Sequence, residues 1–123
     1  MKKSFLFTIL AWALTGCAER QADSEPAVLT DRIRFAEAVC PSGGKLLVGS
    51  FGSSSLDPLN TEGKGYVLEF TDTVSRVLIP SDGNLSAPKG MLVKDSCLLI
   101  ADVGKLAVYD LRDTAAVPQI VRF

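Results

Sequence analysis

The chain has 123 residues, of which 47% are hydrophobic, and its 13 basic and 14 acidic side chains give a net charge of −1. This length fits one domain, and because the sequence contains no basic patch or run, nucleic acid is not an expected partner. Histidine is absent, which excludes histidine-based catalysis and histidine-ligated zinc within this chain.

The N-terminus carries the pattern of an export signal. Lys2 and Lys3 precede an apolar stretch over residues 5–14, about half the roughly 20 residues that a membrane-spanning helix needs. Its last residue, Leu14, begins the string Leu-Thr-Gly-Cys at residues 14–17. This string resembles the lipobox of bacterial lipoprotein signals, and the resemblance implies cleavage before Cys17 and acylation of Cys17. The alternative is an ordinary secretory signal followed by an incidental cysteine.

The lipobox resemblance also implies a location. Mature lipoproteins of this kind carry several acyl chains, which anchor a protein stably where a single chain does not. Ala18 follows the cysteine, at the position where aspartate would signal retention in the inner membrane. We therefore expect the outer membrane of the bacterial cell envelope, at the periplasm. Residues 1–16 are interpreted as the signal peptide, residues 17–30 as a lipid-anchored tether and residues 31–123 as the folded part.

Beyond the tether the chain consists of short apolar runs separated by clusters of Gly, Pro, Ser, Asn and Asp. This pattern is typical of an all-β sandwich, barrel or propeller. The runs at residues 46–48 and 98–100 are continuous, which predicts strands that are buried on both faces. Residues 30–39 fit either a helix or a strand. The expected strands span residues 45–49, 66–70, 76–80, 91–94, 97–102, 106–110 and 119–123.

An internal repeat organises these strands. Residues 35–52 align without gaps on residues 87–104, at an offset of 52. Further along the chain Phe70 matches Tyr109 at an offset of 39, because the first unit contains an extra loop. Without that loop the period is about forty residues, and a four-stranded unit of this period is the sequence pattern of a β-propeller blade.

The repeat predicts an all-β fold with two four-stranded antiparallel sheets, over about residues 34–80 and 86–123. Residues 43–44 and 95–96 occupy the first hairpin turn of each unit. The repeat also favours a strand over a helix from about Glu37 onward.

Residues 35–51 and 87–111 resemble blades of the senescence-marker-protein and gluconolactonase propellers and of the related NHL-repeat propellers. In those families a Pro-x-Gly string opens the inner strand, here at residues 88–90, and a Leu-Tyr-Val-Ala-Asp-like string follows, here at residues 98–102. The resemblance covers about residues 35–123 and implies a propeller. Because closed propellers have about four to eight blades, we expect the N-terminal part of a longer propeller; a complete small β-sandwich is the alternative.

In the lactonase branch of the family an inner-strand glutamate binds a divalent metal, and Glu37 stands at the matching position, so the resemblance implies a metal ligand there. An asparagine supplies a second ligand in the family, but this chain has Lys89 at that position. A protonated lysine cannot ligate a hard cation. No cofactor is therefore expected unless the lactonase alternative holds. The repeat instead places Glu37 and Lys89 at the same position of adjacent units, which predicts an ion pair or a water bridge between them.

Polar loops at one end of the sheets hold further candidates for ligand binding. Residues 51–64, 81–88 and 102–104 are expected to gather on one face, where propellers usually bind ligands. The alternative is a set of solvated loops whose polar residues only form turns. The candidate ligand-binding residues are Glu37, Asp57, Asn60 and Asp102.

The sequence thus favours a lipid-anchored, exported module that binds a small molecule or a protein at the cell envelope. Acylated Cys17 would be its contact with the membrane. The alternative is a metal-dependent, lactonase-like hydrolase, and whether the chain is an enzyme stays open because no catalytic residue is recognised. Cys40 and Cys97 fit a disulfide, which the envelope permits, or two buried thiols.

Overall fold

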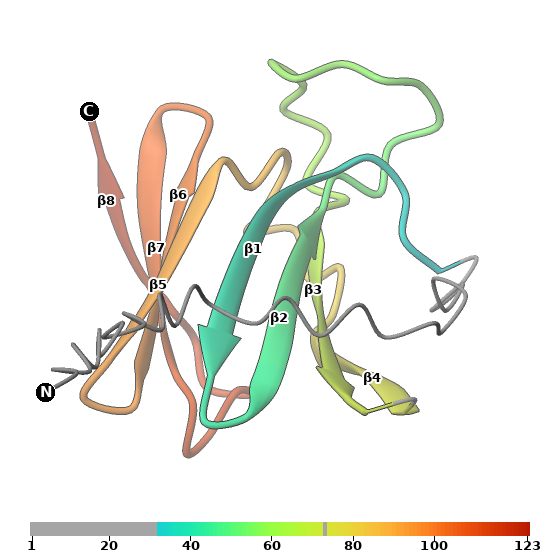
Figure 1. Cartoon of the computed structure of the whole chain (residues 1–123). Helices are drawn as coiled ribbons and strands as arrows, with labels where there is room; N and C mark the ends of the chain where they lie inside the picture. The colour runs from blue at the N-terminus through green and yellow to red at the C-terminus, as the bar shows by residue number, and fades with distance from the viewer. Residues whose placement is uncertain (1–31, 73) are drawn as a thin grey trace, which may run out of the picture.

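A computed structural model describes residues 32–72 and 74–123. The described chain is all-β and forms two four-stranded antiparallel sheets, as predicted, in each of which the strands lie in chain order (Figure 1). The predicted signal peptide, Cys17 and the tether lie outside the described residues. The strands are β1 (Ala36–Ser42), β2 (Lys45–Ser50), β3 (Tyr66–Thr71), β4 (Val74–Ile79), β5 (Gly90–Lys94), β6 (Cys97–Asp102), β7 (Lys105–Asp110) and β8 (Gln119–Arg122).

The internal repeat has a counterpart in the backbone. The β1–β2 turn has φ values of 56° at Gly43 and 77° at Gly44, and the β5–β6 turn has 49° at Asp95 and 63° at Ser96. Two successive positive φ angles define the type I′ turn, whose twist matches that of the strands it joins. The two hairpins therefore close in the same way, although only the first uses glycine.

Two strand boundaries, the starts of β1 and β4, could be fixed only with the structure. The segment that fitted a helix or a strand contains the start of β1, so the strand interpretation is confirmed. β4 begins at Val74, earlier than expected, because Val74 pairs with Thr71 across a tight turn in which Asp72 has a φ of 50°. In the sequence the polar residues around this turn obscure the start of the strand.

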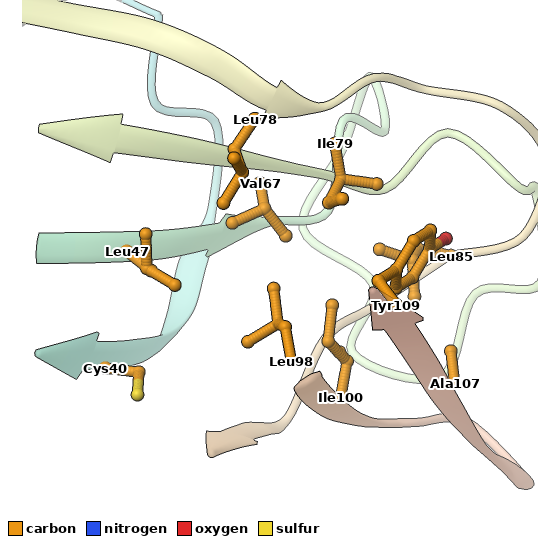
Figure 2. Close-up of a cluster of buried hydrophobic side chains, with 10 residues drawn as sticks. All are labelled: Cys40, Leu47, Val67, Leu78, Ile79, Leu85, Leu98, Ile100, Ala107 and Tyr109. Atoms are coloured by element: carbon orange, nitrogen blue, oxygen red, sulfur yellow. The ribbon is translucent and has the colours of Figure 1, made fainter. Parts of the chain in front are cut away.

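A shared core joins the two sheets. Leu47 and Val67 project from the first sheet toward Leu98, Ile100 and Tyr109 of the second (Figure 2). Fully burying an aliphatic side chain stabilises a fold by about 1.5–3 kcal/mol, so this cluster fixes the two sheets against each other. The remaining members are Cys40, Leu78, Ile79, Leu85 and Ala107.

The two continuous apolar runs differ in burial. In β2, Leu47 faces the shared core, whereas Val48 packs on the opposite face with Leu68 and Phe70. In β6, Ile100 faces the shared core, but Leu99 on the other face is only half-buried. The prediction of burial on both faces is therefore confirmed for β2 and wrong for β6, because no second layer of described residues covers that face.

The two cysteines of the folded part are not paired. Cys40 is a buried thiol in the shared core, and Cys97 is a half-buried thiol at the start of β6. Of the two alternatives that the sequence left open, the structure has the free thiols. No helix in the described part of the chain has the length and apolar character needed to cross a membrane.

Candidate functional site

The loops at the end of the sheets where β1 and β5 begin lie together, as expected (Figure 1). The loop between β2 and β3 donates a hydrogen bond from the Gly63 amide to Ser86 Oγ at 3.0 Å. The Gly65 amide donates to the Leu85 carbonyl at 2.8 Å. These contacts attach the β2–β3 loop to the linker between the two sheets, so both loops belong to one surface, which we call the loop face.

Asp102 fixes the linker from the second sheet. Its carboxylate accepts hydrogen bonds from the amides of Ser86 and Ala87, each at 2.7 Å, and Lys105 Nζ lies 3.5 Å away. The Asp102 side chain is fully buried. Both oxygens of this candidate ligand-binding residue thus accept backbone donors, which is a structural use of the carboxylate.

Asp57 and Asn60 shape the β2–β3 loop. Asp57 Oδ1 accepts the Leu59 amide at 3.0 Å, and its carbonyl accepts Asn60 Nδ2 at 2.8 Å. The buried Asn60 then accepts the Glu62 amide through Oδ1 at 3.2 Å. Asx turns of this kind satisfy backbone groups locally. The structure brings these two candidates together, and their polar atoms hold the loop in shape.

Glu37 and Lys89 form the predicted ion pair. Lys89 Nζ donates to Glu37 Oε2 at 2.8 Å and lies 4.7 Å from the centre of the Phe51 ring. Glu37 is the residue at which the β1–β2 register shifts, since Ala36 pairs with Ser50 and Ala38 with Gly49. A β-bulge re-aims the side chain of its extra residue, which explains how a residue of β1 reaches the start of β5.

The loop face therefore presents a paired cation and anion beside a buried aromatic ring. The side chains of Glu37 and Lys89 are 48% and 27% exposed, so a polar ligand could reach both. Within residues 32–72 and 74–123 no three acidic or cysteine side chains lie close enough together to hold a metal ion. The arrangement suits binding through charge and hydrogen bonds.

A second polar cluster, which the sequence analysis missed, lies between the sheets at the opposite end. Glu69 accepts Arg76 Nε at 2.6 Å and Lys45 Nζ at 3.3 Å. These three residues and Leu111 line a cavity of about 260 Å³. Burial alone would raise the pKa of Glu69, but the hydrogen bonds from Arg76 and Lys45 lower it below its ordinary value.

The sequence contained a signal for this cluster. Glu69 is a charged residue inside an otherwise apolar run, and such a residue requires a partner when it is buried. The partners become visible only with the register, in which Glu69 pairs with Arg76 of β4. A similar case is the buried Tyr109, whose hydroxyl donates to Asp82 at 3.5 Å; burial and the neighbouring Asp82 carboxylate raise the pKa of Tyr109.

Comparisons of the chain with models of known protein families, with curated proteins and with solved structures found no match. The loop face and the N-terminal sequence are therefore the features of the chain that bear on its function.

Proposed function

We propose that this protein is an exported, lipid-anchored module that binds a small molecule or a protein at the cell envelope through its loop face. The observation that supports binding over hydrolysis is the contact of Lys89 Nζ with the Glu37 carboxylate at 2.8 Å. In the lactonase-like alternative Glu37 would be a metal ligand. Here its carboxylate carries a lysine partner instead.

The remaining oxygen donors support the same proposal. A divalent cation such as calcium takes six to eight oxygen ligands, which have to be free to turn toward it. The carboxylate of Asp102 and the side-chain oxygens of Asp57 and Asn60 accept backbone amides. To bind a metal at this face, the chain would have to release Lys89 and open at least one of these loops.

The outer part of the loop face favours an extended partner. Leu56 and Leu59 are 65% and 75% exposed in the β2–β3 loop. Their loop is held by the Asp57 and Asn60 hydrogen bonds, so the two leucines are presented on an ordered backbone. Exposed apolar side chains on an ordered loop are typical of the mixed surfaces that proteins use for recognition.

Calorimetric titration of the protein with Ca²⁺, Mn²⁺ and Zn²⁺ tests the proposal. We expect no stoichiometric binding by the wild-type protein and none by Glu37→Gln. Lys89→Asn is titrated in parallel, because it restores the asparagine oxygen that the lactonase pattern has at this position. Tight binding by the wild type that Glu37→Gln removes would overturn the proposal and favour the metal-dependent hydrolase.

The lipid anchor is tested separately. Acyl labelling in a bacterial host should mark the wild-type protein, and Cys17→Ser should lose the label and accumulate as an unprocessed precursor. Cys40→Ser is the matched control, because it removes a thiol of the folded part and should keep the label. Labelling that persists in Cys17→Ser would show that the proposed attachment site is wrong.

A further inference from the structure

The two sheets are equivalent repeat units, but they contact each other through different faces. The face that the first sheet uses corresponds to the face of the second sheet that points away from the contact. Leu98 and Ile100, which face the first sheet, correspond in the repeat to Leu46 and Val48. In the first sheet these two residues lie on the face that points away from the second sheet, in the cluster with Phe70. The contact is therefore heterologous, joining two different faces of one unit, and such a contact can be repeated by further units.

The far face of the second sheet has the composition of a contact surface. Leu92, Leu99 and Leu106 lie on it, and they correspond to Cys40, Leu47 and Val67, which the second sheet buries in the shared core. Leu92 is 55% exposed. We call the surface formed by Leu92, Leu99, Leu106, Val108 and Val121 the open face.

The centre of the open face contains no charged side chain. Val108 stands where the first sheet has Glu69, and Val121, at 54% exposure, pairs with Leu106 on the neighbouring strand. Exposed contiguous apolar surface on one face of a sheet indicates an interaction site. Because the same positions of the first sheet receive a four-stranded sheet of the same repeat, the occupant that fits this face is another such sheet.

The chain itself contains the complementary surface. Val48, Leu68 and Phe70 on the far face of the first sheet correspond to Ile100, Ala107 and Tyr109, which form the facing side of the contact inside the chain. Ile33 packs against this cluster. Its segment is held by the Tyr66 hydroxyl, which donates to the Arg32 carbonyl. Ile33 thus occupies the place that a neighbouring sheet would take.

We infer that the open face binds the far face of β1–β4 of a second copy of this chain, so that the contact inside the chain is repeated between copies. The docked copy displaces Ile33 and buries Leu99 and Val108. Head-to-tail contacts close into rings when the rotation permits, and closed propellers contain about four to eight sheets. Each copy contributes the two described sheets to such an assembly.

Site-specific photo-crosslinking of the full chain in cells tests this arrangement. A photoreactive amino acid replaces Leu99 at the centre of the open face, and the adducts are digested and sequenced by mass spectrometry. We expect adducts between copies in which position 99 is joined to β2 or β3 of the second copy. The same probe at Leu59, which is 75% exposed in the loop face, is the control and should not give that adduct.

Two substitutions sharpen the test, with the probe moved to Leu92. Val108→Asp places an unpaired carboxylate in the contact and should reduce the adduct between copies about tenfold or more. Ile33→Ser removes the competing side chain and should increase it. Circular dichroism checks that both variants keep their sheets. Adducts that join two open faces, adducts with other proteins alone, or no adduct at all would each overturn the inference.

Discussion

The two sheets share strand order and turn geometry but differ at one corner. In the first sheet Lys45 and Arg76 hold the buried Glu69 beside the cavity between the sheets. The corresponding residues of the second sheet are Cys97, Gln119 and Val108, which line a cavity of about 240 Å³ on the open face. The first corner holds two ion pairs and is closed by Leu111, which follows β7. In the second corner Val108 replaces the buried glutamate, Asp110 lies in the lining, and no described residue of the first sheet closes the cavity.

This difference distinguishes the sequence features that form a four-stranded sheet from the residues that join one sheet to another. Cross-strand register, type I′ turns and apolar patterning are common to both units, and they are sufficient for each four-stranded sheet. The residues at the corner act later, when one sheet meets another. Substitutions at equivalent positions of the two units can therefore test which role each residue has.

Ser50 and Asp102 occupy equivalent positions of the two units, and substitutions there should give the largest difference in stability. Asp102→Ala leaves two buried amides and the 11% exposed Lys105 without their acceptor, so we expect a loss of about 3–5 kcal/mol in the free energy of unfolding. Ser50 Oγ is buried without a hydrogen-bond partner among the described residues, so Ser50→Ala should leave stability unchanged or raise it by about 1 kcal/mol. Urea unfolding measures both, and equal losses would contradict this account.

Gly52 and Gly104 should differ next. Both have positive φ, 68° and 65°, but a Cβ at Gly52 would lie 1.9 Å from the Lys64 carbonyl oxygen, whereas nothing lies within 4 Å at Gly104. Gly104→Ala should cost about 1–2 kcal/mol through backbone strain alone. Gly52→Ala should cost about 3 kcal/mol or more, because the β2–β3 loop has to move as well. Thermal unfolding compares the two, and an equal shift would show that the loop yields freely.

Glu69 should make stability depend on pH in the acid range. Its pKa in the folded protein lies below the ordinary value of 4.5, because the hydrogen bonds from Arg76 and Lys45 outweigh the effect of burial. The stabilisation is therefore complete above about pH 4.5 and is lost as the pH falls through the lowered pKa. Glu69→Gln should lose about 1–2 kcal/mol at pH 7, since the side chains of Lys45 and Arg76 are 43% and 60% exposed to solvent.

The matched control is a triple variant in which the three corner residues of the first sheet are replaced by their equivalents from the second sheet. Lys45→Cys, Glu69→Val and Arg76→Gln together remove the charges and restore an apolar contact, so stability at pH 7 should stay within about 1 kcal/mol of the wild type. Denaturant unfolding at pH 7 and pH 3 compares the three proteins. If Glu69→Gln keeps the full acid sensitivity of the wild type, the dependence belongs to another carboxylate, such as Asp110, whose pKa is lowered to about 2 by Arg112.

The Glu37–Lys89 pair should contribute least to stability. Both side chains reach solvent, so a double-mutant cycle with Glu37→Gln and Lys89→Met should give a coupling of about 0–1 kcal/mol that weakens with salt. Lys89→Met should cost about 0.5 kcal/mol more than Glu37→Gln, because it also loses the contact with the Phe51 ring. A coupling well above this range would indicate that the pair holds the sheets together.

The fold was largely predictable because its determinants are local in sequence. The apolar runs, the two-residue turns at residues 43–44 and 95–96 and the offset of the repeat specify both hairpins. The pairing of Glu37 with Lys89 followed from the same offset. The half-buried state of Leu99 did not, because an apolar run has the same sequence whether or not another layer covers it.

The candidate site was less predictable. Asp57, Asn60 and Asp102 offer the same oxygens to a ligand or to a backbone amide, and only the path of the loops decides between these uses. The Glu69 cluster depends on the register between β3 and β4, which includes an irregularity between Val67 and Leu68. Such information arises from tertiary contacts and is absent from residue spacing.

The chain-order arrangement of the strands also has a consequence for the time course of folding. Every strand pairs with a neighbour in the sequence, so each sheet closes through short-range contacts, which form quickly. A chain that folds from its N-terminus first would complete β1–β4 while β5 was still unavailable. During that interval Leu47 and Val67 would face water, and the rate at which β5–β8 arrives would decide between correct folding and aggregation.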